Sequence, residues 1–164
     1  MPDDPIIKGI RRVRPEDKAP VMALLHATGF FRPGELVIAE EVFNEALTKG
    51  PQGDYQSFVA VEDAQTVGWL CFGQTPCTLG TFDIYWVAVD PQYQGRGIGK
   101  ALMNYAHTCI QNRQGRLIVV ETSGNPRYIS TRRFYESLGY IQEACLKDFY
   151  AVGDDKIIYI YRSC

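Results

Sequence analysis

The sequence predicts a mixed α/β fold of the α+β type, in which a central, twisted and mostly antiparallel sheet of about six or seven strands is flanked by about four helices. Two observations predict this class. Apolar residues repeat at helical spacing in some segments, whereas other segments are rich in β-branched and aromatic residues and end at turn-forming residues. The chain has 164 residues, of which 46% are hydrophobic, which is enough to bury one substantial core. We therefore expect a single domain over residues 1–164.

The first third of the chain should form one strand and two helices. Residues 6–13 have the character of a strand. Pro15 and the two acidic residues after it then open a helix that runs to about residue 28, because proline and acidic side chains favour the first turn of a helix. Pro33 opens a second helix, in which apolar residues recur at helical spacing until Gly50-Pro51 ends it.

A meander of strands and a third helix should follow. Residues 55–61 and 66–72 are β-rich, and the short polar link between them is typical of a hairpin turn. A strand at residues 81–89 would complete the meander. From Gly97 the apolar residues change to helical spacing and form one stripe, so we expect a helix that ends near Gly115.

The last third of the chain should add three strands and a fourth helix. The apolar run at residues 117–120 suits a central strand, and residues 126–138 have the pattern of a helix that is closed by a glycine. Two further strands are expected near residues 140–150 and 156–161. The turn Gly153-Asp154 would join them as a hairpin.

The junction between the strand at 81–89 and the third helix is rich in glycine: Gln94-Gly95-Arg96-Gly97-Ile98-Gly99-Lys100. The first N–H groups of a helix have no partner within the helix, and the positive end of the helix dipole faces the turn. Glycines let the backbone approach a phosphate without an intervening β-carbon. The sequence therefore predicts a binding site for a diphosphate, with a plain strand-to-helix connection as the alternative.

Two common nucleotide motifs do not fit this turn. A Walker A loop would need glycine where Gln94 stands and serine or threonine where Ala101 stands. A dinucleotide-binding fingerprint would need glycine or alanine at Lys100 or at Leu102, according to its starting glycine. The diphosphate is therefore not expected to belong to a nucleoside triphosphate or to a nicotinamide dinucleotide.

The hexapeptide at residues 94–99 matches the pattern Gln/Arg-x-x-Gly-x-Gly/Ala and resembles the acetyl-CoA site of the GNAT superfamily of N-acetyltransferases. Residues 133–140, Arg-Phe-Tyr-Glu-Ser-Leu-Gly-Tyr, resemble the second signature of that family. The resemblance is strong over residues 81–140 and loose elsewhere. It implies a GNAT-like fold and an acetyl-CoA-dependent N-acetyltransferase that acts on a primary amine by direct attack in a ternary complex. The alternative is a regulatory module that binds acyl-CoA without reacting.

The resemblance also implies which residues contact acetyl-CoA. In the family, a strand before the glycine turn pairs with the pantetheine arm, and an asparagine seven residues before a family tyrosine contacts the cofactor. This chain has Tyr128 at that position, with an asparagine three residues earlier. Serine and arginine side chains on the last helix are further candidates, with a solvated surface role as the alternative. The expected contacts are Val87, Ala88, Val89, Gln94, Gly95, Arg96, Gly97, Ile98, Gly99, Lys100, Asn125, Ser130 and Arg132.

Asp83 is the first candidate for the general base. An unperturbed lysine amine with a pKa of ~10.4 costs roughly 4.6 kcal/mol to deprotonate at pH 7, so a side-chain acceptor needs a base. Asp83 lies between Phe82 and Ile84, and burial there would raise its pKa. Lysine-modifying members of the family have a strand glutamate at the same spacing before the glycine turn. Aspartate is one methylene shorter, so a water could relay the proton; the alternative is a carboxylate that faces water.

Two further residues complete the candidate catalytic set. Glu121 follows the apolar run at 117–120, and open sheets bind ligands at the C-terminal ends of strands; its alternative role is an ion pair with Arg116 or Arg127. Tyr135 matches the family tyrosine that donates a proton to the thiolate of coenzyme A. Because an unperturbed thiol has a pKa near ~8.5, this donation should help turnover without being essential.

Composition excludes several partners. The formal net charge is −2 and the basic residues are scattered, so no nucleic acid is expected. No apolar run reaches the ~18 residues that span a bilayer, and the acidic start lacks the order of a signal peptide. The five cysteines form no C-x-x-C pair, which predicts reduced thiols in the cytoplasm and no metal.

We expect a small-molecule or peptide amine as acceptor, bound by residues 30–47 and 147–156, and leave a homodimer open.

Overall fold

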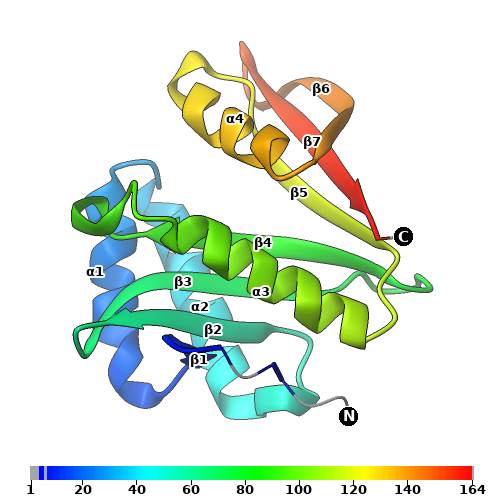
Figure 1. The fold of residues 1–164 in the computed structure, drawn as a ribbon. Helices are drawn as coiled ribbons and strands as arrows, with labels where there is room; N and C mark the ends of the chain where they lie inside the picture. The colour runs from blue at the N-terminus through cyan, green and yellow to red at the C-terminus, as the bar shows by residue number, and fades with distance from the viewer. Residues whose placement is uncertain (1–3, 6, 164) are drawn as a thin grey trace. The chain divides into compact units, whose positions relative to one another are not determined.

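The computed structural model describes residues 4–5 and 7–163, and it has the mixed α/β fold that the sequence predicts (Figure 1). The described residues form four α-helices and seven strands, and four of the connections contain a short 3₁₀ helix (η). The elements are, in chain order, β1 (Ile10–Arg12), η1 (Pro15–Asp17), α1 (Lys18–Thr28), α2 (Pro33–Lys49), η2 (Gly50–Gln52), β2 (Gln56–Glu62), β3 (Gln65–Gln74), β4 (Thr81–Val89), η3 (Pro91–Tyr93), α3 (Ile98–Asn112), β5 (Leu117–Ser123), η4 (Pro126–Tyr128), α4 (Ile129–Ser137), β6 (Ile141–Ala151) and β7 (Asp154–Arg162).

The strands are hydrogen-bonded in the order β1-β2-β3-β4-β5-β7-β6. Strands β1 and β2, β2 and β3, β5 and β7, and β6 and β7 are antiparallel, whereas β4 and β5 are parallel. This mostly antiparallel, open sheet confirms the predicted fold class.

The described chain divides into two compact units. The first unit takes its residues from Met1–Gly73 and Ile84–Arg113, and the second from Gln74–Asp83 and Gln114–Cys164. Strand β4 contributes its first three residues to the second unit and the rest to the first. The single domain expected over residues 1–164 stays a prediction.

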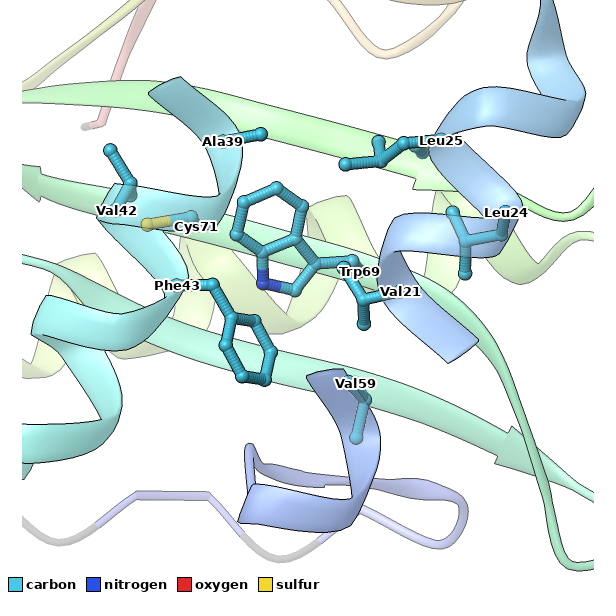
Figure 2. Close-up of a cluster of buried hydrophobic side chains, with 10 residues drawn as sticks. Val21, Leu24, Leu25, Ala39, Val42, Phe43, Val59, Trp69 and Cys71 are labelled. Carbon is cyan, nitrogen blue, oxygen red and sulfur yellow. The ribbon is translucent and has the colours of Figure 1, made fainter. Parts of the chain in front are cut away.

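The core of the first unit lies between its strands and the helices α1 and α2. Figure 2 shows the indole of Trp69 on β3 beside Val21, Leu24 and Leu25 of α1 and Phe43 of α2. These side chains are buried, and Phe43 and Trp69 have ring centroids 6.1 Å apart. Burial of this size supplies most of the free energy that holds an amphipathic helix on a sheet.

Helix α3 covers the opposite face of the first unit's strands (Figure 1). Successive side chains of a strand point to opposite faces. Phe58 of β2 points toward α3, and the centroids of the Phe58 and Tyr105 rings are 4.9 Å apart. A β-carbon at Gly68 would lie 2.9 Å from Leu102 Cδ1, so glycine allows α3 to approach β3 closely. Most of the apolar stripe predicted for α3 is buried, although Ala101 of that stripe is exposed and Met103, outside it, is buried.

The second unit consists of β5, β6, β7, the start of β4 and the helix α4. Helix α4 packs on the sheet through Tyr135, whose ring centroid is 6.2 Å from that of Tyr159 on β7. The hydroxyl of Tyr159 donates to Glu136 Oε1 at 2.9 Å. The hairpin of β6 and β7 turns at residues 152–153, where Gly153 has a φ of +81°.

Several expected boundaries differ from the structure. The strand expected at 6–13 spans only Ile10–Arg12, because the backbone turns at Gly9, whose φ is +84°; residue 6 lies outside the described residues, as do residues 1–3 of the acidic start and Cys164. Strand β5 continues to Ser123 because it pairs with β7 over its whole length. The last helix begins as the 3₁₀ turn η4, and its α-helical part starts at Ile129.

Candidate active site

The glycine turn between β4 and α3 presents an open backbone surface. Gly95 and Gly97 have φ values of +77° and +80°, a conformation that favours glycine, and a β-carbon on either would meet no atom within 4 Å. Ala101 N donates to Gly97 O at 2.9 Å as the first helical bond. The N–H groups of residues 98–100 therefore have no acceptor within α3. Together with the helix dipole, they form a suitable site for an anion.

Side chains around the turn hold it in this shape. Gln94 Nε2 donates to Val89 O at 3.1 Å, and Asp90 Oδ1 accepts from Gln92 N at 2.9 Å. The guanidinium of Arg96 lies 4.9 Å from the ring centroid of Tyr93 and 3.5 Å from Glu62 Oε1. Gln94 and Arg96, both expected to contact the cofactor, thus also support the turn itself.

Strand β4 presents alternating faces, as the sequence indicates. Phe82, Ile84 and Ala88 are buried, while Asp83 and Val87 are partly exposed. Asp83, Tyr85, Val87 and Val89 therefore share the more open face of this strand.

Asp83 is half-buried at the start of β4. Its Oδ2 accepts a hydrogen bond from Thr75 Oγ1 at 2.5 Å. Burial raises the pKa of Asp83, and the nearby charge of Glu121 raises it further; the Thr75 hydrogen bond and the charge of Lys156 act in the opposite direction. The net effect is a pKa above the usual range, as the sequence analysis expected for a buried carboxylate at this position.

Glu121 forms an ion pair with Lys156, with 2.8 Å between Glu121 Oε2 and Lys156 Nζ. Arg116 or Arg127 was the ion-pair partner expected from the sequence; instead, Arg116 Nε donates to Leu79 O at 2.7 Å. Glu121 keeps 44% of its side-chain surface exposed, whereas Lys156 keeps only 14%. The ammonium group of Lys156 also lies 4.1 Å from the ring centroid of Phe149.

Strand pairing places the two carboxylates on one face of the second unit. Asp83 pairs with Val119, two residues before Glu121, and Glu121 pairs with Ile158, two residues after Lys156. Side chains of paired residues point to the same face, and residues two apart in a strand share a face. Asp83, Glu121 and Lys156 thus lie on a common face, while Tyr135 packs on the opposite one.

Tyr135 is buried among aromatic rings. Its centroid lies 5.8 Å from that of Tyr140, in addition to its contact with Tyr159. Burial raises the pKa of Tyr135 to about 12, so the phenol is protonated at neutral pH and can act as a proton donor. Its hydroxyl makes no hydrogen bond with any residue that the structure describes.

The candidates after β5 have local partners. Asn125 Oδ1 accepts from Arg127 N at 3.0 Å and so caps η4. Arg132 Nη1 donates to Ser123 O at 2.8 Å and to Asn125 O at 3.0 Å. Ser130 is exposed. Asn125 and Arg132 therefore stabilise the turn between β5 and α4, whatever else they bind.

The acidic residues of the terminal hairpin accept hydrogen bonds from within the hairpin and from β5. Asp148 Oδ1 accepts from Gly153 N at 2.6 Å, and Asp155 accepts from Asp148 N at 3.0 Å and from Lys147 Nζ at 2.8 Å. Asp154 accepts a short hydrogen bond from Ser123 Oγ. These carboxylates are less available to a cationic acceptor than the sequence alone suggests.

Among residues 4–5 and 7–163, no group of three or more His, Cys, Asp or Glu side chains could hold a metal ion. No helix in the part of the chain that the structure describes combines the length and the apolar character needed to cross a membrane.

Comparison with known proteins identifies the family. A model of the acetyltransferase (GNAT) domain matches residues 53–142, which is more than half of the chain. The chain therefore belongs to the GNAT family of acetyltransferases, as the two sequence signatures indicated. A crystal structure of a GNAT-family acetyltransferase from Desulfovibrio desulfuricans is 44% identical, with a TM-score of 0.90, and the match covers 93% of this chain and 97% of the other.

Two other proteins are more distantly similar. The mycothiol acetyltransferase of Mycolicibacterium smegmatis is 32% identical over 108 residues, which cover 62% of this chain and 35% of that protein, so the match spans about a third of the curated relative. An aminoglycoside 6′-N-acetyltransferase, crystallised with coenzyme A, is 19% identical with a TM-score of 0.73; the match covers 93% of this chain and 96% of the other. The latter likeness shows a shared fold.

Proposed function

We propose that the chain transfers the acetyl group of acetyl-CoA to a primary amine of a small molecule or a peptide. The observation that carries this proposal is the open glycine turn at the start of α3, where Gly95 and Gly97 have positive φ values and open space at the positions that a β-carbon would take. A GNAT-family chain with such a turn has the means to bind the diphosphate of coenzyme A. Bound acetyl-CoA would supply the thioester whose acetyl group moves to the amine and whose thiol is released.

The turn fits a diphosphate in both shape and charge. The space above Gly95 and Gly97 is empty of protein atoms within 4 Å of a β-carbon position, and the first turn of α3 contains no acidic side chain that would repel an anion. We assign the diphosphate to the backbone of residues 95–100. The backbone of Val87, Ala88 and Val89 is assigned to the pantetheine arm, and Asn125, Ser130 and Arg132 remain proposed neighbours of the cofactor.

Asp83 is our choice for the general base, with Glu121 as the second candidate. Asp83 has a raised pKa, which makes a carboxylate a stronger base, and Thr75 is its one hydrogen-bond donor among the described residues. Glu121 is already paired with Lys156. In this scheme a proton of the acceptor ammonium passes to Asp83, directly or through a water, and the neutral amine can then attack.

Tyr135 is proposed as the proton donor to the leaving thiol. Its raised pKa keeps the phenol protonated at neutral pH, and a thiolate whose thiol has an ordinary pKa of ~8.5 needs only modest help to leave.

The described cysteines, Cys71, Cys77, Cys109 and Cys145, are free thiols, which supports a cytoplasmic location. A homodimer is left open.

Release of the free thiol of coenzyme A, followed over a panel of amines, tests the proposal. The panel contains N-terminal peptides, lysine peptides, polyamines, amino acids and aminoglycosides, and mass spectrometry identifies the acetylated product. We expect acetylation of at least one amine class. Tight binding of coenzyme A without transfer to any amine would favour the non-catalytic alternative, and absence of coenzyme A binding would overturn the proposal.

A further inference from the structure

Lys156 stands out among the charged residues of the second unit because it is nearly buried. Only 14% of its side chain is exposed, although burial of a cation is costly unless it is paired. Its partners are the carboxylate of Glu121 at 2.8 Å and the ring face of Phe149, whose centroid is 4.1 Å away. The second contact is within the range of a cation–π interaction, so the ammonium group is held from two sides.

The position of Lys156 follows from the register of three strands. Ser123 of β5 pairs with Lys156 of β7, and Glu121 pairs with Ile158. The side chain of Lys156 therefore reaches diagonally across the two strands to Glu121. On the other side of β5, Asp83 pairs with Val119. One face of the second unit thus presents, in order across the strands, a carboxylate, a second carboxylate and the cation that neutralises it.

We propose that Lys156 is a positioning residue, which holds Glu121 as a fixed, ion-paired carboxylate so that Asp83 takes the proton of the acceptor amine. This inference rests on the proposed acetyl transfer to an amine. It assigns different roles to Asp83 and Glu121, which the sequence ranks as the first and second candidates for the base. Glu121 and Lys156 form a neutral pair that sets the local electrostatic environment of Asp83.

The groups that act on Asp83 are few. Glu121 raises its pKa, while Lys156 and the Thr75 hydrogen bond lower it. Two other charged residues of β7 share this face. Asp154 accepts a hydrogen bond from Ser123 Oγ. Arg162 pairs with Leu117, at the opposite end of β5 from Ser123, and it is exposed. Paired residues of β6 on this face are Ala144 and Leu146, which carry no charge. The charges of Glu121 and Lys156 therefore shift the pKa of Asp83 in opposite directions.

Replacement of Lys156 and replacement of Glu121 should shift the pH profile of kcat/KM in opposite directions. In Lys156→Met the cation is lost and the carboxylate of Glu121 remains, so the pKa of Asp83 rises and the acid limb of kcat/KM moves to higher pH. In Glu121→Gln the anion is lost and the cation remains, so the acid limb moves to lower pH. The ionisation of the acceptor amine is the same in every variant. If Lys156 and Glu121 only stabilised the fold, their replacement would reduce activity but would not move the acid limb of kcat/KM in opposite directions.

The experiment compares Lys156→Met, Lys156→Arg and Glu121→Gln with the wild-type chain, and Arg162→Met serves as the matched control for loss of a cation from β7. The pH profile of kcat/KM is measured with one acceptor, and the carboxyl pKa values of Asp83 and Glu121 are measured by NMR without acceptor. We expect the two opposite shifts by both methods, a wild-type profile for Lys156→Arg, and no shift for Arg162→Met.

Several outcomes would overturn the inference. Unchanged Asp83 titration in Lys156→Met, or shifts of the same sign in Lys156→Met and Glu121→Gln, would show that the pair does not control Asp83. A loss of kcat in Glu121→Gln as large as that in Asp83→Asn would make Glu121 the base. Failure of the wild-type chain to acetylate any amine would contradict the proposed function instead, and the NMR titration would still report the effect of Lys156 on Asp83. Thermal melting identifies any variant that fails to fold; if Lys156→Met does so, the shift of the Asp83 pKa in Glu121→Gln carries the test.

Discussion

Thr75 Oγ1 donates a hydrogen bond to Asp83 Oδ2 across 2.5 Å. Thr75 follows the end of β3 and Asp83 lies near the start of β4, so the bond closes the loop between these strands. The other oxygen of Asp83, Oδ1, accepts no hydrogen bond from the described residues. The carboxylate is therefore fixed in direction while one of its oxygens can still take a proton.

Asp83→Asn should lower kcat with a lysine-like amine by about 10²- to 10⁴-fold at neutral pH, the usual contribution of a general base. The loss should be smaller at pH 9, because more of the amine is already neutral there. The raised pKa of Asp83 also predicts that the wild-type activity falls as the pH drops through that pKa and the base becomes protonated. Steady-state kinetics from about pH 4 to 9, a range that begins near the ordinary pKa of an aspartate, check both statements. Equal losses at pH 7 and pH 9 would contradict the role of Asp83 as base.

Gly97→Val should abolish measurable binding of coenzyme A. The branched side chain would occupy the open space above the turn, and the φ of +80° at this position disfavours any residue with a β-carbon. Calorimetric titration of coenzyme A checks the prediction. Gly50→Val is the matched control, because Gly50 also has a positive φ and open surroundings but lies at the end of α2. If Gly97→Val retains the wild-type affinity for coenzyme A, this turn does not bind the diphosphate.

Tyr135→Phe should reduce kcat by roughly tenfold, because proton donation to a thiolate of low basicity is helpful but not essential. The free energy of unfolding should change by less than about 0.5 kcal/mol, because the lost hydroxyl makes no hydrogen bond among the described residues. Tyr159→Phe is the matched comparison: it loses the bond to Glu136 and should cost about 1 kcal/mol of stability with little effect on kcat. Wild-type kcat in Tyr135→Phe would exclude the tyrosine as donor.

Asp17→Asn should destabilise the fold by about 2–4 kcal/mol at pH 7, because Asp17 is buried and paired with Arg11. Burial disfavours its charge, but hydrogen bonds from Arg11, Thr66 and the Arg14 N–H outweigh burial and hold its pKa below the usual range. A lowered pKa gives stability that is present above the unfolded-state pKa and is lost as the pH falls through the folded-state pKa.

Urea unfolding at pH 7 and at pH 3 measures this effect, and the exposed Glu16→Gln is the control. The difference between wild type and Asp17→Asn should be largest at pH 7 and should shrink at the lower pH. A constant difference at the two pH values would show that the charge of Asp17 does not contribute.

Much of the fold could be predicted from residue patterns. The change from alternating to helical spacing located α3, and the polar link between β2 and β3 located their hairpin. The length of β1 could not be predicted, because the sequence does not show that Gly9 adopts a positive φ and turns the backbone. The end of β5 depends on its pairing with β7, which is distant in the sequence.

The candidate site was predictable where it depends on one segment. The glycine turn is a local pattern, and its shape follows from Gly95 and Gly97 themselves. The ion pair of Glu121 and Lys156 depends on the register between two strands, and the nearer arginines in the sequence, Arg116 and Arg127, were the natural but wrong expectation. A nearly buried lysine beside Phe149 has no signal in a single sequence.

The most direct test of the central claim is a two-dimensional NMR titration of the labelled protein with coenzyme A and, separately, with pantetheine, which lacks the diphosphate. If the turn binds the diphosphate, coenzyme A shifts the amide resonances of residues 95–100 and pantetheine leaves them in place. Binding of coenzyme A without any change in those amides, or equal shifts with pantetheine, would contradict it.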